Sequence, residues 1–362
     1  MKTRNIIVAV VIIVCALGSI LYVSPTLLRP PAPMEGNYAV EYGLQYFPYL
    51  FDSINNTLVA DLQPQWFRIT APHQSTYPYP NHEKLMKAFP DVNILMVIGA
   101  STMGADEEGC TYRRSNVFSQ PNANARISSC GWSLQDWDAN VSRLVEAFPN
   151  VHAWEIWNVP DFNQGGYLCC EDDVTLMAHH YFDMLKDAYQ IIKAHNPNDS
   201  VIAFSLLVMT DWAGPKHEWI KQFVEKVWEL GAADYCDAIS FHAFTRDTPT
   251  YWVDRPGSAW QARLEMFEAV TGKPVWITET GMPSNNADKG ATPESQATYL
   301  THAFSFFGQY SYVKVVIWSY LYDPSDQADY GLLTVAPISE QAPKPAYYAF
   351  QHFTKKQTTA ST

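Results

Sequence analysis

Four polar residues could do chemistry together: Glu279, Arg68, His242 and Asn158 each stand at or near the end of a short apolar run. A carboxylate among apolar residues is unfavourable unless a partner satisfies it, and Arg68 could be that partner. One interpretation is a structural ion pair. Another is a carboxylate that arginine keeps ionised for use as a nucleophile, and both can hold at once. A lone histidine is more often a core residue, but the presence of Glu279 and Asn158 in the same group of residues favours a functional role for His242.

These residues need structural elements that bring them together. Short apolar, β-branched or aromatic runs predict strands, and longer periodic stretches predict helices. Strands are expected at 38–45, 66–70, 93–98, 152–157, 201–206, 238–243, 275–280 and 312–320. Helices are expected at 51–62, 81–89, 134–148, 174–195, 218–230, 259–270, 293–307 and, to close the domain, 345–353.

Eight alternating strands and helices predict an α/β fold, a (β/α)8 TIM barrel that forms a single domain over residues 37–356. An open doubly wound sheet is the alternative, but no glycine-rich phosphate-binding turn follows the first strand. The active site of a β/α barrel lies at the carboxyl ends of its strands. That end of the barrel is where Arg68, Asn158, His242 and Glu279 would meet.

Several segments resemble the retaining glycoside hydrolases built on (β/α)8 barrels, the clan A superfamily that includes cellulases, xylosidases and iduronidases. The run Trp154–Asp161 is similar to the W-E-x-W-N-E-P-D signature of that superfamily, and Trp276–Gly281 is similar to its nucleophile motif. The Gly-Leu turn within Asp329–Leu333 and the Lys-Pro-Ala-Tyr-Tyr-Ala run within Lys344–Phe350 are similar to its usual ending. The resemblance covers nearly all of the chain after residue 36.

The resemblance implies a role for each matching residue. Glu279 would be the nucleophile, which attacks the anomeric carbon and forms a glycosyl-enzyme intermediate. Asn158 would hydrogen-bond the sugar 2-hydroxyl, and Arg68 and His242 would orient Glu279 and tune its charge. Trp318 would form the floor of the subsite that holds the non-reducing sugar.

The sequence departs from the family pattern at one position. The acid/base glutamate of the family follows the asparagine, and this chain has Val159 there. Valine cannot protonate a leaving oxygen, and general acid–base assistance is typically worth about 10² to 10⁴ in rate. Glu155 does not fill the role, because the strand pleat points it elsewhere than Asn158 or Val159, which favours a structural carboxylate in the barrel interior.

Three explanations could account for the missing acid/base glutamate. A carboxylate on the following loop, Asp161 or Glu171, could swing in as the acid, although Asp161 has an ordinary place in the family motif as a loop-start residue. A substrate with a good leaving group could need no acid. Otherwise, the site could bind sugar without cleaving it.

Two classes of function follow. We favour an enzyme that acts on O-glycosidic bonds, and the alternative is a catalytically inactive carbohydrate-binding or cell-surface protein. The 12 Trp and 21 Tyr are compatible with a sugar partner, whereas a net charge of −13 argues against nucleic acid. No cofactor or metal is expected, since His179 and His180 form an isolated pair on a predicted helix.

The N-terminal segment indicates a location outside the cytoplasm. Lys2 and Arg4 precede an apolar run of 18 residues at 6–23, which is close to the roughly 20 that a membrane span needs. We favour an uncleaved signal anchor within residues 1–28, and a cleaved signal peptide with a secreted product is the alternative. A proline-rich spacer at 29–36 would follow, and residues 357–362 would form a tail.

Overall fold

The computed structural model describes residues 40–72, 78–99, 133–160, 173–209, 215–244, 259–285, 291–322 and 329–360. The chain divides into two compact units, Met1–Gly36 and Asn37–Thr362, and every described residue lies in the second. The predicted anchor or signal peptide and the spacer therefore lie outside the described residues. Within the described part, no helix has the length and apolar character to cross a membrane.

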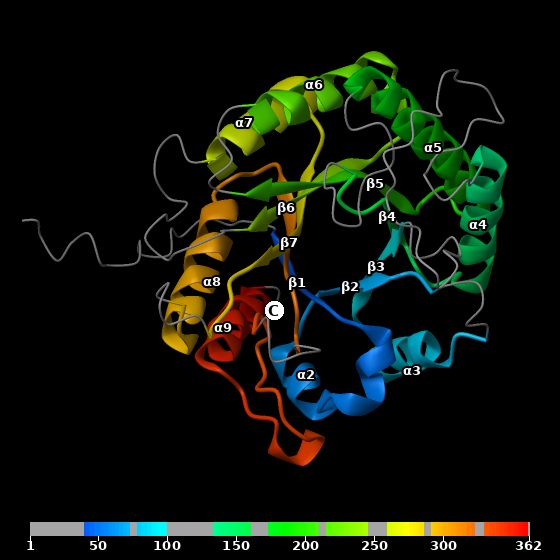
Figure 1. Cartoon of the computed structure of the whole chain (residues 1–362). Coiled ribbons are helices and arrows are strands. Elements are labelled where there is room, and N and C mark those ends of the chain that lie inside the picture. Colours follow the sequence, from blue (N-terminus) through cyan, green and yellow to red (C-terminus); the bar gives the residue numbers. More distant parts are fainter. Residues whose placement is uncertain are drawn as a thin grey trace, which may run out of the picture. The chain divides into compact units, whose positions relative to one another are not determined.

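Eight parallel strands close into a barrel, in which each strand pairs with the next and β8 pairs back with β1 (Figure 1). The predicted TIM barrel is confirmed. The strands are β1 (Glu41–Gln45), β2 (Trp66–Thr70), β3 (Asn93–Ile98), β4 (Ala153–Ile156), β5 (Ser200–Met209), β6 (Ala238–Phe244), β7 (Val275–Gly281) and β8 (Val313–Trp318).

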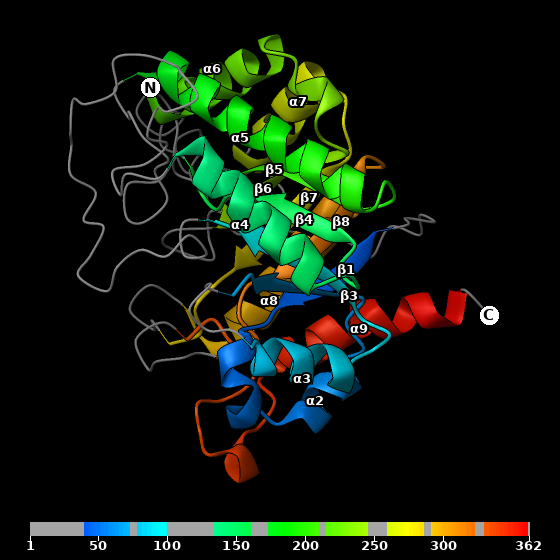
Figure 2. The ribbon, with the colours of Figure 1, turned by 90° about the vertical axis from the view of Figure 1, so that its right-hand side faces the viewer.

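Helices surround the strands (Figures 1 and 2). The α-helices in the described ranges are α2 (Asn56–Leu62), α3 (Pro80–Ala88), α4 (Leu134–Ala147), α5 (Val174–His195), α6 (Pro215–Glu229), α7 (Ala259–Thr271), α8 (Pro293–Phe307) and α9 (Pro345–Ala360). Short 3-10 helices lie at η2 (Pro48–Ser53), η5 (Ala232–Asp234) and η7 (Ile338–Glu340).

Side-chain caps fix where several helices begin. α4 and α8 start at capping boxes, in which Ser133 pairs with Asp136 and Thr292 pairs with Ser295. The prediction of one helix over 51–62 was wrong at its start, because the Asn55 side chain caps α2 and the residues before it form η2. The closing helix is also longer than predicted and continues to Ala360.

The two faces of each strand build different layers. Outward-facing side chains join the helices in one large apolar core, and a smaller cluster fills the lower barrel interior. This interior cluster consists of Leu95, Ala153, Ile202, Ala238, Trp276, Val315 and Ile317. Because side chains alternate along a strand, the interior residues two positions further on are Arg68, Glu155 and Ser240, which follow Trp66, Ala153 and Ala238. The barrel interior therefore changes from apolar to polar toward the carboxyl ends of the strands.

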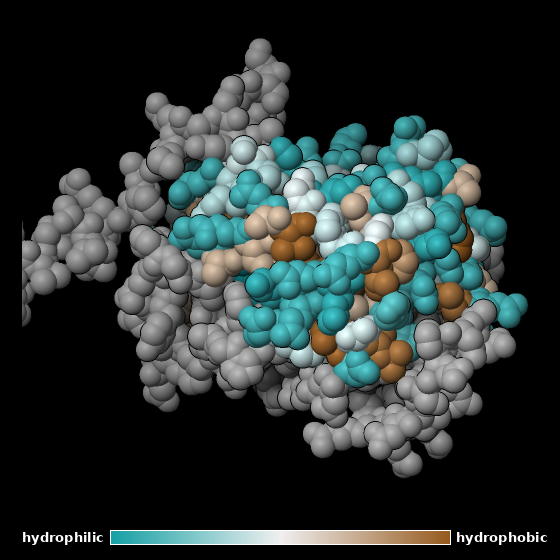
Figure 3. Space-filling view, turned by 90° about the horizontal axis from the view of Figure 1, so that it is seen from above, coloured by the Kyte–Doolittle hydropathy of each residue, from teal (hydrophilic) through white to brown (hydrophobic). Residues whose placement is uncertain are grey.

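The face of the molecule in Figure 3 is largely hydrophilic where its residues are coloured, and the apolar residues there lie in separate patches. Among the described residues, the exposed large hydrophobic side chains are Tyr49, Val335, Ile338 and Tyr348. Tyr49 is 61% exposed and lies in η2, in the segment that follows the carboxyl end of β1.

Gly43 allows β1 to approach β2 at the closure of the barrel. A Cβ at this position would lie 2.7 Å from both the Cβ and the backbone oxygen of Trp66 and 3.2 Å from Ile317. Backbone atoms cannot move aside without shifting a strand, so we expect Gly43→Ala to destabilise the protein by about 1–3 kcal/mol. Urea unfolding followed by circular dichroism measures the effect. Gly99→Ala is the matched control, because its Cβ would lie 3.7 Å from Asn158, and an equal loss in both variants would contradict the prediction.

Candidate active site

Arg68 lies at the centre of the polar cluster in the upper barrel. Its side chain is 2% exposed, and its three guanidinium nitrogens bond three different residues. Nε donates to Glu155 at 2.7 Å, one terminal nitrogen donates to Glu279, and the other donates to Asn158 Oδ1 at 2.8 Å. The structure thus brings Arg68, Asn158 and Glu279 together, as the strand-end argument predicts.

Glu155 is the structural counter-charge of Arg68. It is fully buried, and its second oxygen accepts a hydrogen bond of 2.6 Å from Ser240 Oγ. Ser240 was not singled out from the sequence, although it lies two residues before His242 and therefore on the same face of β6. A carboxylate with both oxygens bound and no exposed surface cannot reach a substrate, so the prediction that Glu155 is an interior carboxylate is confirmed.

Glu279 is the partly accessible carboxylate of this cluster. Its side chain is 14% exposed, Oε1 pairs with Arg68, and Oε2 lies 3.6 Å from His242 Nδ1. Burial raises the pKa of Glu279, Arg68 opposes that rise, and the nearby Glu155 adds to it. The arrangement leaves Glu279 open to a ligand while Arg68 favours its charged form.

His242 is a neutral imidazole in this environment. Burial, and then the adjacent Arg68, hold its pKa well below the usual range. Nε2 lies 2.9 Å from Ser205 Oγ and 3.3 Å from a terminal nitrogen of Arg68. Because arginine only donates, Nε2 acts as the acceptor, which places the imidazole proton on Nδ1, facing Glu279. The neutral His242 therefore turns its Nδ1–H toward Glu279 Oε2, 3.6 Å away, and does not compete for the charge of the carboxylate.

The backbone is strained where β4 ends. Trp157 and Val159, on either side of Asn158, have φ angles of 74° and 44°. A bulky or β-branched residue is rare in this left-handed region, and such strain is concentrated at functional sites. Phe204 and Ser205 also have positive φ, at the register shift of β5, and Ser205 O accepts the Val159 N–H at 3.0 Å. This hydrogen bond joins the strained segment after β4, which carries Asn158, to the strained segment of β5, which carries Ser205.

Val159, which the sequence resemblance predicts to occupy the position of the acid/base glutamate, lies directly after Asn158. Its side chain is half-buried and carries no proton to give. The candidate replacement acids, Asp161 and Glu171, lie outside the described residues. Within the described ranges, the carboxylates that bond Arg68 are Glu155 and Glu279, and no group of three or more potential metal ligands occurs.

The predicted role of Trp318 as a subsite floor was wrong. Val315 and Ile317 face the barrel interior, so Trp318 faces the helices, where it is fully buried in the apolar core beside Tyr299. Its indole nitrogen donates to the backbone oxygen of Tyr330 at 3.1 Å. A ring with no exposed face cannot stack on a sugar, so Trp318 supports the loop above it instead.

Four half-buried rings that the sequence argument missed lie at the rim of the barrel. We call Phe47, Tyr320, Tyr330 and Phe244 the rim aromatics. The ring centroids of Phe47 and Tyr320 are 5.4 Å apart, those of Tyr320 and Tyr330 are 5.9 Å apart, and those of Tyr330 and Phe244 are 6.2 Å apart. Tyr330 also lies over Gly281, at the end of β7, where a Cβ would meet its ring at 3.3 Å. Phe244 is the last residue of β6, Phe47 follows β1, and Tyr320 and Tyr330 follow β8. The strand pattern alone does not predict that these four rings meet.

The fold and the site define a (β/α)8 barrel with a carboxylate–arginine centre at the carboxyl ends of its strands. The family model of the glycosyl hydrolase catalytic core matches residues 127–335, more than half of the chain. The chain belongs to this family, and it is a glycoside hydrolase-like TIM barrel. A search of curated proteins gives no match.

Solved structures with the same barrel are distant in sequence. A β-glycosidase from Pyrococcus horikoshii has a TM-score of 0.59 at 12% identity, over 90% of this chain and 96% of that one. Xylanase 10B from Thermotoga maritima has a TM-score of 0.55 at 14% identity, over 88% of this chain and 96% of that one. The GH53 catalytic domain from Ignisphaera aggregans has a TM-score of 0.59 at 14% identity, over 88% of this chain and 98% of that one. At these identities the likeness supports the fold alone.

Proposed function

We propose that this protein is a glycoside hydrolase-like enzyme that acts by a retaining mechanism, with Glu279 as nucleophile and without the usual acid/base glutamate. One observation carries the proposal: Glu279 is partly exposed, and one buried arginine joins it to Asn158. In this arrangement the carboxylate is held beside an amide that can hydrogen-bond a sugar hydroxyl. Membership of the glycosyl hydrolase catalytic core family supports the same class.

The proposed reaction has two steps. In the first step, a carboxylate oxygen of Glu279 bonds to the anomeric carbon as the bond to the leaving oxygen breaks. Because Val159 gives no proton, the leaving oxygen departs as an anion and takes its proton from solvent. In the second step, the oxygen of a water molecule bonds to the anomeric carbon as the bond to Glu279 breaks, and a proton of the water passes to solvent. Asn158 holds the sugar, and Arg68 and His242 hold Glu279 in place.

The site therefore favours substrates whose leaving group is stable as an anion. Val159 also motivates a second candidate, a protein of the same fold that binds carbohydrate without cleaving it. The two candidates differ in one observable property, which is turnover of a substrate that needs no acid.

A panel of aryl glycosides with activated leaving groups tests the proposal on the protein from residue 37 onward, with the full-length chain tested in parallel. We expect slow release of the aryl alcohol from at least one sugar in the panel. Azide should accelerate it and give a glycosyl azide, because an anion needs no general base in the second step. If sugars bind but no aryl alcohol is released across the panel, the proposed enzymatic function is wrong and the carbohydrate-binding function is supported.

The pH dependence of this turnover follows from the site. Glu279 must be ionised to attack, so kcat/KM should fall as the pH drops through its pKa, which burial places above the ordinary glutamate value. No loss is expected at high pH, because Val159 does not titrate and His242 is already neutral. Initial rates from pH 4 to about 9 measure the profile. A bell-shaped profile would contradict the prediction, since it would require a second titrating group.

A further inference from the structure

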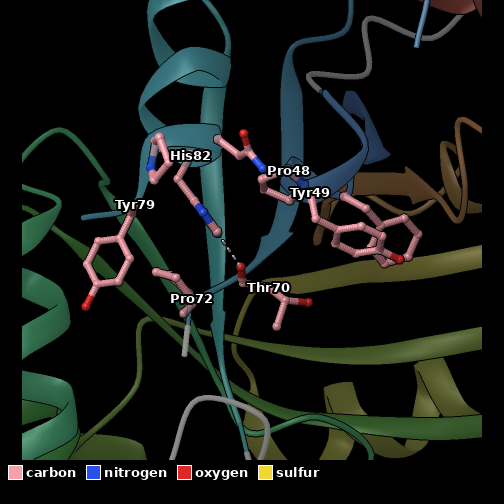
Figure 4. A pocket seen from close by; sticks show the side chains of 10 residues that line it. Pro48, Tyr49, Thr70, Pro72, Tyr79 and His82 are labelled. Carbon is pink, nitrogen blue, oxygen red and sulfur yellow. Dashed lines mark hydrogen bonds between the residues drawn. The ribbon is translucent and has the colours of Figure 1, made fainter. Parts of the chain in front are cut away.

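A hollow lies at the carboxyl end of the strands. It has a volume of about 520 Å³ and is lined by residues 47–49, 70–72 and 79–82, from the segments that follow β1 and β2 (Figure 4). This volume is within the range of about 300–1,000 Å³ typical of small-molecule sites. Thr70 lies two residues beyond Arg68 on β2, so the pocket lies at the same end of the barrel as Glu279.

The pocket has one exposed aromatic wall and one fixed aromatic wall. In Figure 4, Tyr49 and Tyr79 lie on opposite sides of His82. Tyr49 is 61% exposed, whereas Tyr79 is buried, stacked on Phe148 at 5.3 Å, and bound through its hydroxyl to Arg143. Tyr49 is therefore the ring on which a flat ligand with apolar faces can stack, and the buried Tyr79 fixes the opposite side of the pocket.

The polar groups of the described lining fit a ligand without charge. Among the described residues that line the pocket, none is Asp, Glu, Lys or Arg. The neighbouring Arg143 guanidinium is already bonded to the Tyr79 hydroxyl, the Pro72 carbonyl oxygen and Asn140. Burial lowers the pKa of His82, so its imidazole is neutral. His82 Nε2 lies 3.0 Å from the Thr70 carbonyl oxygen, which only accepts, so the proton is on Nε2 and Nδ1 is left as an acceptor for a hydroxyl.

The rim aromatics connect this pocket with the surroundings of Glu279. Phe47 lines the pocket and contacts the ring of Tyr320, which in turn contacts Tyr330 above Gly281. Gly281 lies two residues after Glu279 on β7. A saccharide with one ring at Glu279 would therefore meet an aromatic surface that leads to the pocket.

We propose that this pocket is a subsite for an uncharged pyranose ring that belongs to the same saccharide as the sugar at Glu279. The inference rests on the proposed function and extends it, because it makes the substrate at least a disaccharide and excludes a uronic acid at the second position. The apolar C–H face of the ring packs against Tyr49 and Phe47, and a ring hydroxyl donates to His82 Nδ1.

Binding to the full-length chain tests the subsite without depending on turnover. The probes are neutral disaccharides such as cellobiose and xylobiose, their monosaccharides, and an aldobiouronic acid, titrated by calorimetry. We expect a neutral disaccharide to bind more tightly than its monosaccharide and than the uronic acid. Tyr49→Ala should weaken disaccharide binding about 3- to 10-fold, the range for loss of one aromatic contact, and leave monosaccharide binding unchanged.

Tyr348→Ala is the matched control, because Tyr348 is 60% exposed on α9 and does not line the pocket. It should change neither affinity. If Tyr49→Ala weakened monosaccharide and disaccharide binding equally, the subsite proposal would be wrong. The same would hold if the aldobiouronic acid bound as tightly as the neutral disaccharide. Neither result would contradict the proposed function. Absence of binding by every sugar would overturn both.

Discussion

Replacement of Glu279 by glutamine should abolish the turnover of activated aryl glycosides, with a loss on the order of 10⁴-fold or more. The amide has nearly the same shape as the carboxylate but cannot form the glycosyl-enzyme bond. The partners of Glu279 remain in place, since Arg68 still bonds Glu155 and Asn158. Release of the aryl alcohol, followed by absorbance under saturating substrate, measures the effect.

The loss must be separated from unfolding. Glu279→Gln should keep the circular dichroism spectrum of the parent protein and should still bind sugar. Glu340→Gln, at an exposed position in η7, should retain full turnover as a matched control. Residual turnover within tenfold of the parent protein would show that Glu279 is not the nucleophile.

Replacement of Val159 by glutamate should create hydrolysis of unactivated glycosides. A carboxylic acid in this position can protonate the leaving oxygen, and that assistance is typically worth about 10² to 10⁴ in rate. The side chain of Val159 is only half-buried, so a longer polar side chain does not have to be enclosed in the core. The backbone supports the exchange, because glutamate is not β-branched and tolerates the φ of 44° better than valine.

Val159→Gln is the control for this gain, because it has the size of glutamate without an acidic proton. It should leave unactivated glycosides uncleaved. Val159→Glu should also add a loss of rate at high pH, where the new acid ionises, which is absent from the parent profile. Equal activity in the two variants would mean that the gain does not come from acid catalysis.

Much of the fold could be predicted from the sequence, because each strand is a short apolar run and each helix follows its own periodic pattern. The starts of α4 and α8 coincide with capping residues that the sequence displays. The start of α2 was missed, since periodicity does not distinguish η2 from the first turns of an α-helix. The irregularity of β5 was also missed, because the conformation of Phe204 and Ser205 depends on neighbouring strands.

The candidate site could be predicted where a residue lies on a strand or directly after its carboxyl end. Arg68, His242 and Glu279 lie on β2, β6 and β7, and the structure places them together although the β6–β7 register shifts beside His242 and Glu279. Trp318 was misplaced because its motif was given more weight than the alternation along β8, which turns it toward the helices. The contacts of Ser205, at the register shift of β5, and of the rim aromatics depend on tertiary packing.

Mass spectrometry of a trapped intermediate tests the central claim most directly. A 2-deoxy-2-fluoro glycoside with a dinitrophenyl leaving group needs no acid in the first step, and its fluorine slows the second. After incubation and proteolysis, we predict one added glycosyl group on the peptide that contains Glu279, and none in Glu279→Gln. A glycosyl group on a different carboxylate, formed equally in the variant, would contradict the account.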